Sequence, residues 1–221
     1  MCSFEAKWLF LAIAYIKKAV EEVSGTLFSY LPFWGCAFHE QFKADAAIMA
    51  KMAPGTQLVF LYLYYAENTG SVNLTQIAKA LSLSKATCTR AINDLSASGL
   101  ISQTAEGTNK WITTAYTKSE LLEKAYGRLK TPVDRILYVK GTAQIEHPIA
   151  SGIRALARQS MIGVNDQDGA IAISKKEAAK IPAEDICTKQ YFEDFGGAVI
   201  EVWSYDPIIL ERDGCVDDIS L

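Results

Sequence analysis

The chain has 221 residues, half of them hydrophobic, and a formal net charge of −3. This length and composition suit one or two domains with a buried core. Its five cysteines contain no paired-cysteine motif, and there are only two histidines, which argues against a disulfide framework or a zinc site and for a reduced cytosol.

The first 55 residues are expected to form a helical and aromatic extension. Residues 5–23 predict a helix, and their apolar run at 8–16 is far shorter than the ~20 residues of a membrane span, so we expect no membrane insertion. Aromatic residues crowd positions 26–39, where they would pack in a core or, less commonly, line a ligand pocket. A second helix is predicted over residues 44–52.

A buried helix and a capped helix follow. Residues 56–67 are apolar almost all round, as in a helix buried within its domain. Asn73 and Gln76 form a capping box, which starts a helix with Leu74, Ile77 and Leu81 on one face.

The next helix, residues 84–97, has a cap, a buried stripe and a stop. Ser84 is placed to cap it, and Gly99 supplies a left-handed end. Strands at residues 100–104 and 110–114, around a tip at 106–109, complete the order of a winged helix-turn-helix. The buried stripe at i, i+3, i+4, i+7 spacing is Cys88, Ala91, Ile92 and Leu95.

The outward residues of this helix are small, polar or cationic, which suits a helix in the DNA major groove. Hydroxyls and cations hold phosphates, whereas arginine or asparagine reads base edges. The alternative is a solvated helix face that touches nothing. With the wing included, the candidate DNA contacts are Ser84, Lys85, Thr87, Thr89, Arg90, Asn93, Asn109 and Lys110.

Residues 56–130 resemble the DNA-binding domain of MarR-type bacterial transcriptional regulators. The matching stretches are LTQIAKALSLSKATCTRAINDLSASGLI and YTKSELLEKAYGRLK. The resemblance implies a recognition helix at residues 84–97, a wing at 104–110 with its tip at 107–110, double-stranded DNA as partner, and a homodimer.

The remaining residues predict a second α+β domain, residues 131–221, so that the fold class is α+β. It follows a helix that begins at a Thr117/Glu120 capping box and continues to residue 130. Helix is predicted at 148–160, with Ile149 and Leu156 on its inner side, strands at 170–173 and 198–205, and a helix capped by Ser174.

Basic and acidic residues are concentrated in different segments of the chain. Residues 71–130 carry eight Lys/Arg against four acids, whereas residues 161–221 carry five against thirteen. The basic segment is where a polyanion would bind. Acid pairs such as Asp217-Asp218 are interpreted as solvated loop charge, and the final VDDISL as a boundary or a tail that docks.

Motifs of catalysis and cofactor binding are absent from the sequence: there is no Gly-rich phosphate loop, HExxH or GxSxG. We expect no catalytic residue, metal or cofactor, and a cytoplasmic DNA-binding regulator, with a repressor as the form considered first. Weak similarity of IASGIRALAR and VIEVWSYDP to abortive-infection antitoxins leaves open an antitoxin that represses its own operon. A metal-dependent nucleic-acid enzyme is the rival from another class, and a protein partner or small-molecule effector is left open.

Overall fold

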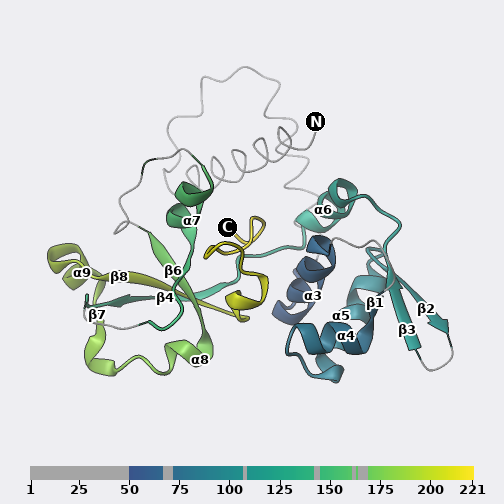
Figure 1. Cartoon of the computed structure of the whole chain (residues 1–221), viewed down its shortest axis with the longest axis horizontal. Coiled ribbons are helices and arrows are strands. Elements are labelled where there is room, and N and C mark those ends of the chain that lie inside the picture. Colours follow the sequence, from purple (N-terminus) through teal and green to yellow (C-terminus); the bar gives the residue numbers. More distant parts are fainter. Residues whose placement is uncertain (1–49, 67–71, 107–108, 142–144, 161–162, 164–168) are drawn as a thin grey trace, which may run out of the picture. The chain divides into compact units, whose positions relative to one another are not determined.

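The computed structural model describes residues 50–66, 72–106, 109–141, 145–160, 163 and 169–221. The chain divides into two compact units, Met1–Ile48 and Met49–Leu221. The expectations for residues 5–23, 26–39 and 44–49 lie outside the described residues. Figure 1 shows the elements of the second unit.

The first described helix, α3 (Pro54–Tyr65), begins at a proline, a residue that suits the first helical turn because it has no amide hydrogen to satisfy there. The prediction of helix up to residue 52 is wrong for residues 50–52, which are not helical. The amide of Met52 instead donates to the carbonyl of Arg128 at 2.8 Å. In addition, Pro54 disfavours helical backbone at the residue before it, Ala53.

The helix-turn-helix follows the predicted caps. In α4 (Leu74–Ala80), Asn73 Oδ1 accepts from the amide of Thr75 at 2.7 Å, and Gln76 Oε1 accepts from the amide of Asn73 at 3.0 Å. The turn places Ser82 at a φ of 52°. In α5 (Lys85–Ala97), Ser84 Oγ accepts from the amide of Thr87 at 3.1 Å, so the predicted N-cap is confirmed.

A three-stranded sheet in the order β1-β3-β2 forms the wing, from β1 (Val72–Asn73), β2 (Ser102–Glu106) and β3 (Asn109–Thr113). The strands reach further toward the tip than predicted. Residues 100 and 101 precede β2 and are buried. The chain turns just before them at Gly99, whose φ of 71° confirms the left-handed stop.

Helix α6 (Lys118–Tyr126) has the predicted capping box, with Thr117 and Glu120 bonding each other's backbone amides. It ends at Tyr126 and not at residue 130, so the predicted end is wrong. The chain turns at Gly127, and the Arg128 side chain points inward to reach the carbonyl of Ala50 at 3.1 Å.

A five-stranded sheet follows in the order β5-β6-β8-β4-β7, with only β6 and β8 parallel. The predictions at 170–173 and 198–205 are confirmed as β6 (Ala170–Ser174) and β8 (Ala198–Trp203). After α6, the sequence predicted nothing at β4 (Val133–Val139), β7 (Ile186–Cys187), α9 (Lys189–Phe195) and the 3-10 turns η1 (Ala183–Asp185) and η2 (Pro207–Leu210).

The prediction of one helix over residues 148–160 is wrong at its start. Ile149 lies in the short strand β5 (Ile149–Ala150), and the helix α7 is Gly152–Gln159. In β5, Ile149 and Ala150 pair with β6. At the start of a helix, their backbone amides would have no partner within the helix. Ser174 caps α8 (Lys175–Ala178) as predicted.

Successive side chains of β6 and β8 point to opposite faces of the sheet, and both faces carry apolar residues. One face includes Ile171, Ile173, Ile200 and Val202 and packs with Ala178 of α8. The other carries Ala172 and Trp203, which belong to the same apolar cluster as the winged-helix core. Glu201 lies on this second face, buried, and accepts hydrogen bonds from the Ser151 hydroxyl and, at 3.3 Å, the Trp203 indole.

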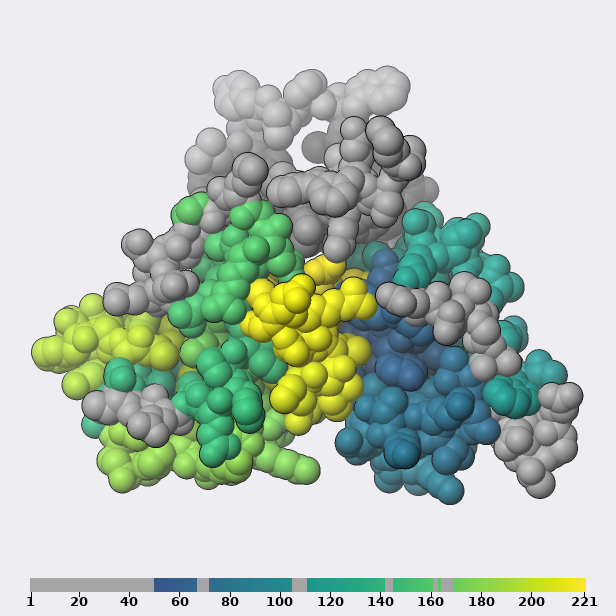
Figure 2. All heavy atoms as spheres, in the orientation of Figure 1, coloured from purple at the N-terminus to yellow at the C-terminus, as the bar shows by residue number. Residues whose placement is uncertain are grey.

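Helix α3 is buried because it has neighbours on more than one side. It packs against α5, and the last residues of the chain, yellow in Figure 2, lie against it. The interpretation of Asp217 as solvated loop charge is therefore wrong: it is 1% exposed, and Tyr65 Oη of α3 donates to its Oδ1 at 3.1 Å. Among the described residues, no helix is both long and apolar enough to cross a bilayer.

Candidate DNA interface

Helix α5 is held in place by its buried stripe and by two contacts from other elements. Cys88, Ala91, Ile92 and Leu95 are all 1% exposed or less, as the sequence predicted. Burial also raises the pKa of the Cys88 thiol, so it acts as a small apolar group here. The first of the two contacts is steric: a Cβ on Gly55 of α3 would come within 3.0 Å of Thr87 Cγ2, so glycine allows the two helices to approach.

The second contact is an ion pair. Arg128 Nη2 donates to Asp94 Oδ1 at 2.9 Å, and the Arg128 side chain is only 10% exposed. Asp94 is the only acid on α5. Its charge is therefore compensated from inside the protein, which leaves the outer surface of the helix without an unpaired carboxylate to repel phosphates. Sequence reasoning missed this pair because residues 94 and 128 are far apart along the chain.

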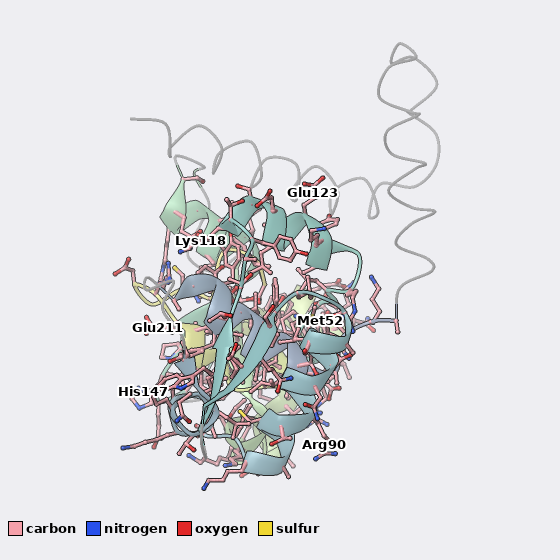
Figure 3. All side chains as sticks on the ribbon, turned by 90° about the vertical axis from the view of Figure 1, so that its right-hand side faces the viewer. Met52, Arg90, Lys118, Glu123, His147 and Glu211 are labelled. Atoms are coloured by element: carbon pink, nitrogen blue, oxygen red, sulfur yellow. The ribbon has the colours of Figure 1, made fainter. Side chains whose placement is uncertain are left out.

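The other side of α5 exposes the predicted groups. Ser84, Lys85, Arg90 and Asn93 are exposed, and Thr89 is half-buried. Figure 3 shows Arg90 extending from the helix toward the outside of the molecule. Within the protein, its Nε makes one long contact, 3.4 Å to the Ala86 carbonyl.

The two threonines are already engaged in local hydrogen bonds. Thr89 Oγ1 donates to the Lys85 carbonyl at 2.8 Å, and Thr87 Oγ1 lies 2.9 Å from Ser84 Oγ. Thr87 is also half-buried against α3. The groups with free donors on this surface are therefore Lys85, Arg90 and Asn93, the side chains best suited to phosphates and base edges.

Gln103 of β2 is a neighbour that the sequence analysis did not single out. Its Nε2 lies 3.5 Å from both Asn93 Oδ1 and the Ile92 carbonyl, so the amide nitrogen faces the Asn93 oxygen. This arrangement favours the Asn93 orientation whose own NH₂ group points away from β2. The only sequence signal was a polar residue in the first wing strand.

The two predicted wing residues lie at the loop end of β3. Asn109 pairs with Glu106 and Lys110 with Ala105 across the hairpin. Their side chains are outside the described part of the structure. The structure thus gathers six of the eight candidates on α5 and its N-cap and places the other two on β3.

Metal chemistry has no counterpart in what the structure describes: within residues 50–66, 72–106, 109–141, 145–160, 163 and 169–221, no three His, Cys, Asp or Glu side chains gather as a metal site would need.

Comparison with known proteins agrees with this geometry. Residues 56–110 match the sequence model of the MarR family, a segment that runs from α3 to the first residues of β3. No curated protein matches the chain. The match therefore covers the helix-turn-helix and most of the wing. Over residues 56–110 the winged helix of this chain is therefore similar to the MarR family, a family of DNA-binding transcriptional regulators.

Proposed function

We propose that the protein represses transcription by binding duplex DNA with α5 in the major groove. The observation that carries this proposal is the surface of α5, which presents Lys85, Arg90 and Asn93 while Arg128 compensates its single acid. A helix with short polar and cationic groups can approach base edges closely. The wing residues Asn109 and Lys110 would contact the backbone beside it.

The active form in this proposal is a homodimer on a two-fold site. A single winged helix offers few phosphate contacts, and two copies on adjacent half-sites supply the affinity that an operator needs. The C-terminal part, with its excess of acids, is repelled by DNA and is free to dimerise or to respond to an effector or a protein partner.

An antitoxin is the second candidate, and one observation favours it. The region of β7 and α9 exposes three large apolar side chains: Phe195 is 73% exposed, Ile186 40% and Tyr191 38%. Exposed apolar groups of this kind can mark a surface for another protein. An antitoxin of this type would keep the DNA-binding role and add a partner, so the two candidates differ in what co-purifies.

Selection of duplex fragments followed by titration tests the proposal. Arg90→Ala should weaken specific binding by about 1–3 kcal/mol if Arg90 contacts a base. Its effect on unfolding should stay within about 0.5 kcal/mol, because Arg90 is exposed. Arg135→Ala, which removes an exposed arginine from β4, is the matched control and should leave DNA binding unchanged. Equal affinity of parent and Arg90→Ala would reject α5 as the reading helix.

A further inference from the structure

The last residues of the chain bury a carboxyl group against the winged helix. Asp217 is 1% exposed, and its Oδ1 accepts from Tyr65 Oη of α3 at 3.1 Å. The same oxygen accepts from the amides of Ile219 at 3.2 Å and Ser220 at 3.1 Å. The amide of Ile219 also donates to Tyr65 Oη at 3.1 Å. One carboxyl oxygen therefore ties the turn at residues 217–220 to α3.

The same segment, residues 206–221, is also tied to the five-stranded sheet. The amide of Val216 donates to the Ala150 carbonyl at 2.9 Å, and the amide of Ala150 donates to the Gly214 carbonyl at 2.8 Å. Ala150 belongs to β5, so these residues extend the edge of the sheet. The C-terminal segment thus joins β5 on one side to α3 on the other.

Helix α3 in turn supports the candidate reading helix. Gly55 of α3 lies so close to α5 that an added Cβ would meet Thr87 Cγ2 at 3.0 Å. Leu58 and Leu61 of α3 belong to the same buried cluster as Ile92 and Leu95 of α5. A contiguous set of packed groups therefore runs from the C-terminal segment through α3 to α5.

We propose that residues 206–221 couple the five-stranded sheet to DNA recognition, with Tyr65 and Asp217 as positioning residues that set how α3 supports α5. The proposal rests on the proposed DNA-binding function. A ligand or partner that moves the sheet would act on DNA binding through this segment. By linkage, if docking of the segment on α3 raises the affinity for DNA by some factor, DNA binding favours docking by the same factor.

Docking of residues 206–221 on α3 should also depend on pH. Burial raises the pKa of the Asp217 carboxyl, and the smaller effects of hydrogen bonds from Ser220, Tyr65 and Ile219 oppose this rise. Asp217 Oδ2 is buried and has no hydrogen-bond partner among the described residues. The ionised carboxylate is therefore poorly satisfied when the segment is docked.

The neighbouring titratable groups do not supply a compensating cation. Tyr65 faces Asp217 from α3. Tyr205, which follows β8, has its pKa raised first by burial and then by the charge of Asp217. On the segment itself, Asp218 adds negative charge, and Arg212 stacks on the Tyr65 ring with Cζ 4.3 Å from the centroid. In the described part of the chain, no lysine or arginine forms an ion pair with Asp217.

The sign of the pH effect follows from the raised pKa. The docked carboxyl holds its proton more tightly than the exposed one, so docking is favoured below the exposed pKa. That contribution is lost as the pH rises through the docked pKa. Asp217→Asn has no such proton to lose, so its docking should not change over this pH range.

The experiment uses the full chain and two readouts between about pH 4 and about pH 8. Amide hydrogen exchange of residues 216–221, corrected for the intrinsic rate, reports docking without DNA. Titration of the selected duplex reports coupling to α5. The variants are Asp217→Asn, Tyr65→Phe and Asp217→Ala, and the control is Asp213→Asn, the same substitution at an exposed position of the same segment.

We expect protection of residues 216–221 in the parent to fall with rising pH relative to Asp217→Asn, and specific DNA affinity to fall with it. Asp217→Ala and Tyr65→Phe should weaken specific binding by about fivefold or more, and Asp213→Asn should behave as the parent. Matching pH profiles of parent and Asp217→Asn, or unchanged DNA affinity in variants that lose protection, would overturn the coupling. Failure of the parent itself to bind DNA would instead reject the proposed function, while exchange would still measure docking.

Discussion

Arg128 and Asp94 illustrate how single residues shape the candidate DNA-binding surface. The guanidinium of Arg128 reaches Asp94 of α5 and the carbonyl of Ala50, and the arginine is almost fully buried. Removing a partner of a charged hydrogen bond costs more than the mean worth of that bond, because the other group is left unsatisfied.

Arg128→Ala should therefore lower the free energy of unfolding by about 1–3 kcal/mol, measured by urea denaturation. Asp94→Asn keeps an acceptor for the guanidinium and should cost less. It should also leave DNA affinity intact or higher, since it removes the only acid of α5. A cost as large for Asp94→Asn as for Arg128→Ala would show that the charge itself holds α5 to the turn after α6.

Leu95 tests the opposite surface of the same helix. It is fully buried, so Leu95→Ala should cost roughly 2–5 kcal/mol of stability through the cavity it leaves. Any loss of DNA binding should then follow the unfolded fraction, which thermal melts and DNA titrations at one salt concentration would reveal. A mutant that melts like the parent would mean that the helical phase is wrong.

Helices α3 and α5 pack closely at Gly55. Gly55 occupies the first turn of α3, and an added Cβ would lie 3.0 Å from the methyl group of Thr87. Alanine exceeds glycine in helix propensity by about 1 kcal/mol, so the contact with Thr87 decides whether Gly55→Ala raises or lowers the stability.

Gly55→Ala should therefore fail to stabilise the protein in spite of its better propensity. Adding Thr87→Ser deletes the methyl group and keeps the hydroxyl beside Ser84, so the double mutant should recover part of the gain. Thermal melts of the four proteins should show non-additivity of about 0.5 kcal/mol or more. Additive effects would indicate that the two helices adjust without strain.

Across the whole molecule, charge is distributed unevenly, and this predicts how DNA binding responds to salt. Residues 71–130 carry a net charge of +4. Arg128 does not contribute to contacts with DNA because it is paired with Asp94 inside the protein. A handful of phosphate contacts per dimer should reduce affinity roughly tenfold or more between low and physiological salt. Binding that does not change with salt in a fluorescence titration would contradict phosphate contacts by this surface.

The apolar cluster that the winged helix shares with the sheet predicts cooperative unfolding. It includes residues of α3 and α5 together with Trp203 and Val216. Trp111 reports on the wing and Trp203 on the sheet, so in a variant that retains one of them the fluorescence midpoint should equal the circular-dichroism midpoint of the same variant. An earlier transition at Trp111 would show that the winged helix unfolds independently, which would also separate residues 56–130 from 131–221 as the sequence predicts.

Local patterns in the sequence were enough to predict the helix-turn-helix. Caps at Asn73, Ser84 and Thr117 and the buried stripe of α5 depend on residues three or four apart, and the structure confirms them. Such signals are satisfied within one or two helical turns. The family match at residues 56–110 depends on the same local segment.

Tertiary structure alone decided the features that depend on distant residues. The strand β4 was not predicted, because its sequence has exposed polar residues and gains its order from pairing with β8. Asp217 looked like solvated charge, since nothing near it in sequence reveals that Tyr65 will cover it. Burial and pairing are properties of neighbours in space, so the sequence could predict which helix is the candidate to read DNA, whereas only the fold determined what holds that helix in place.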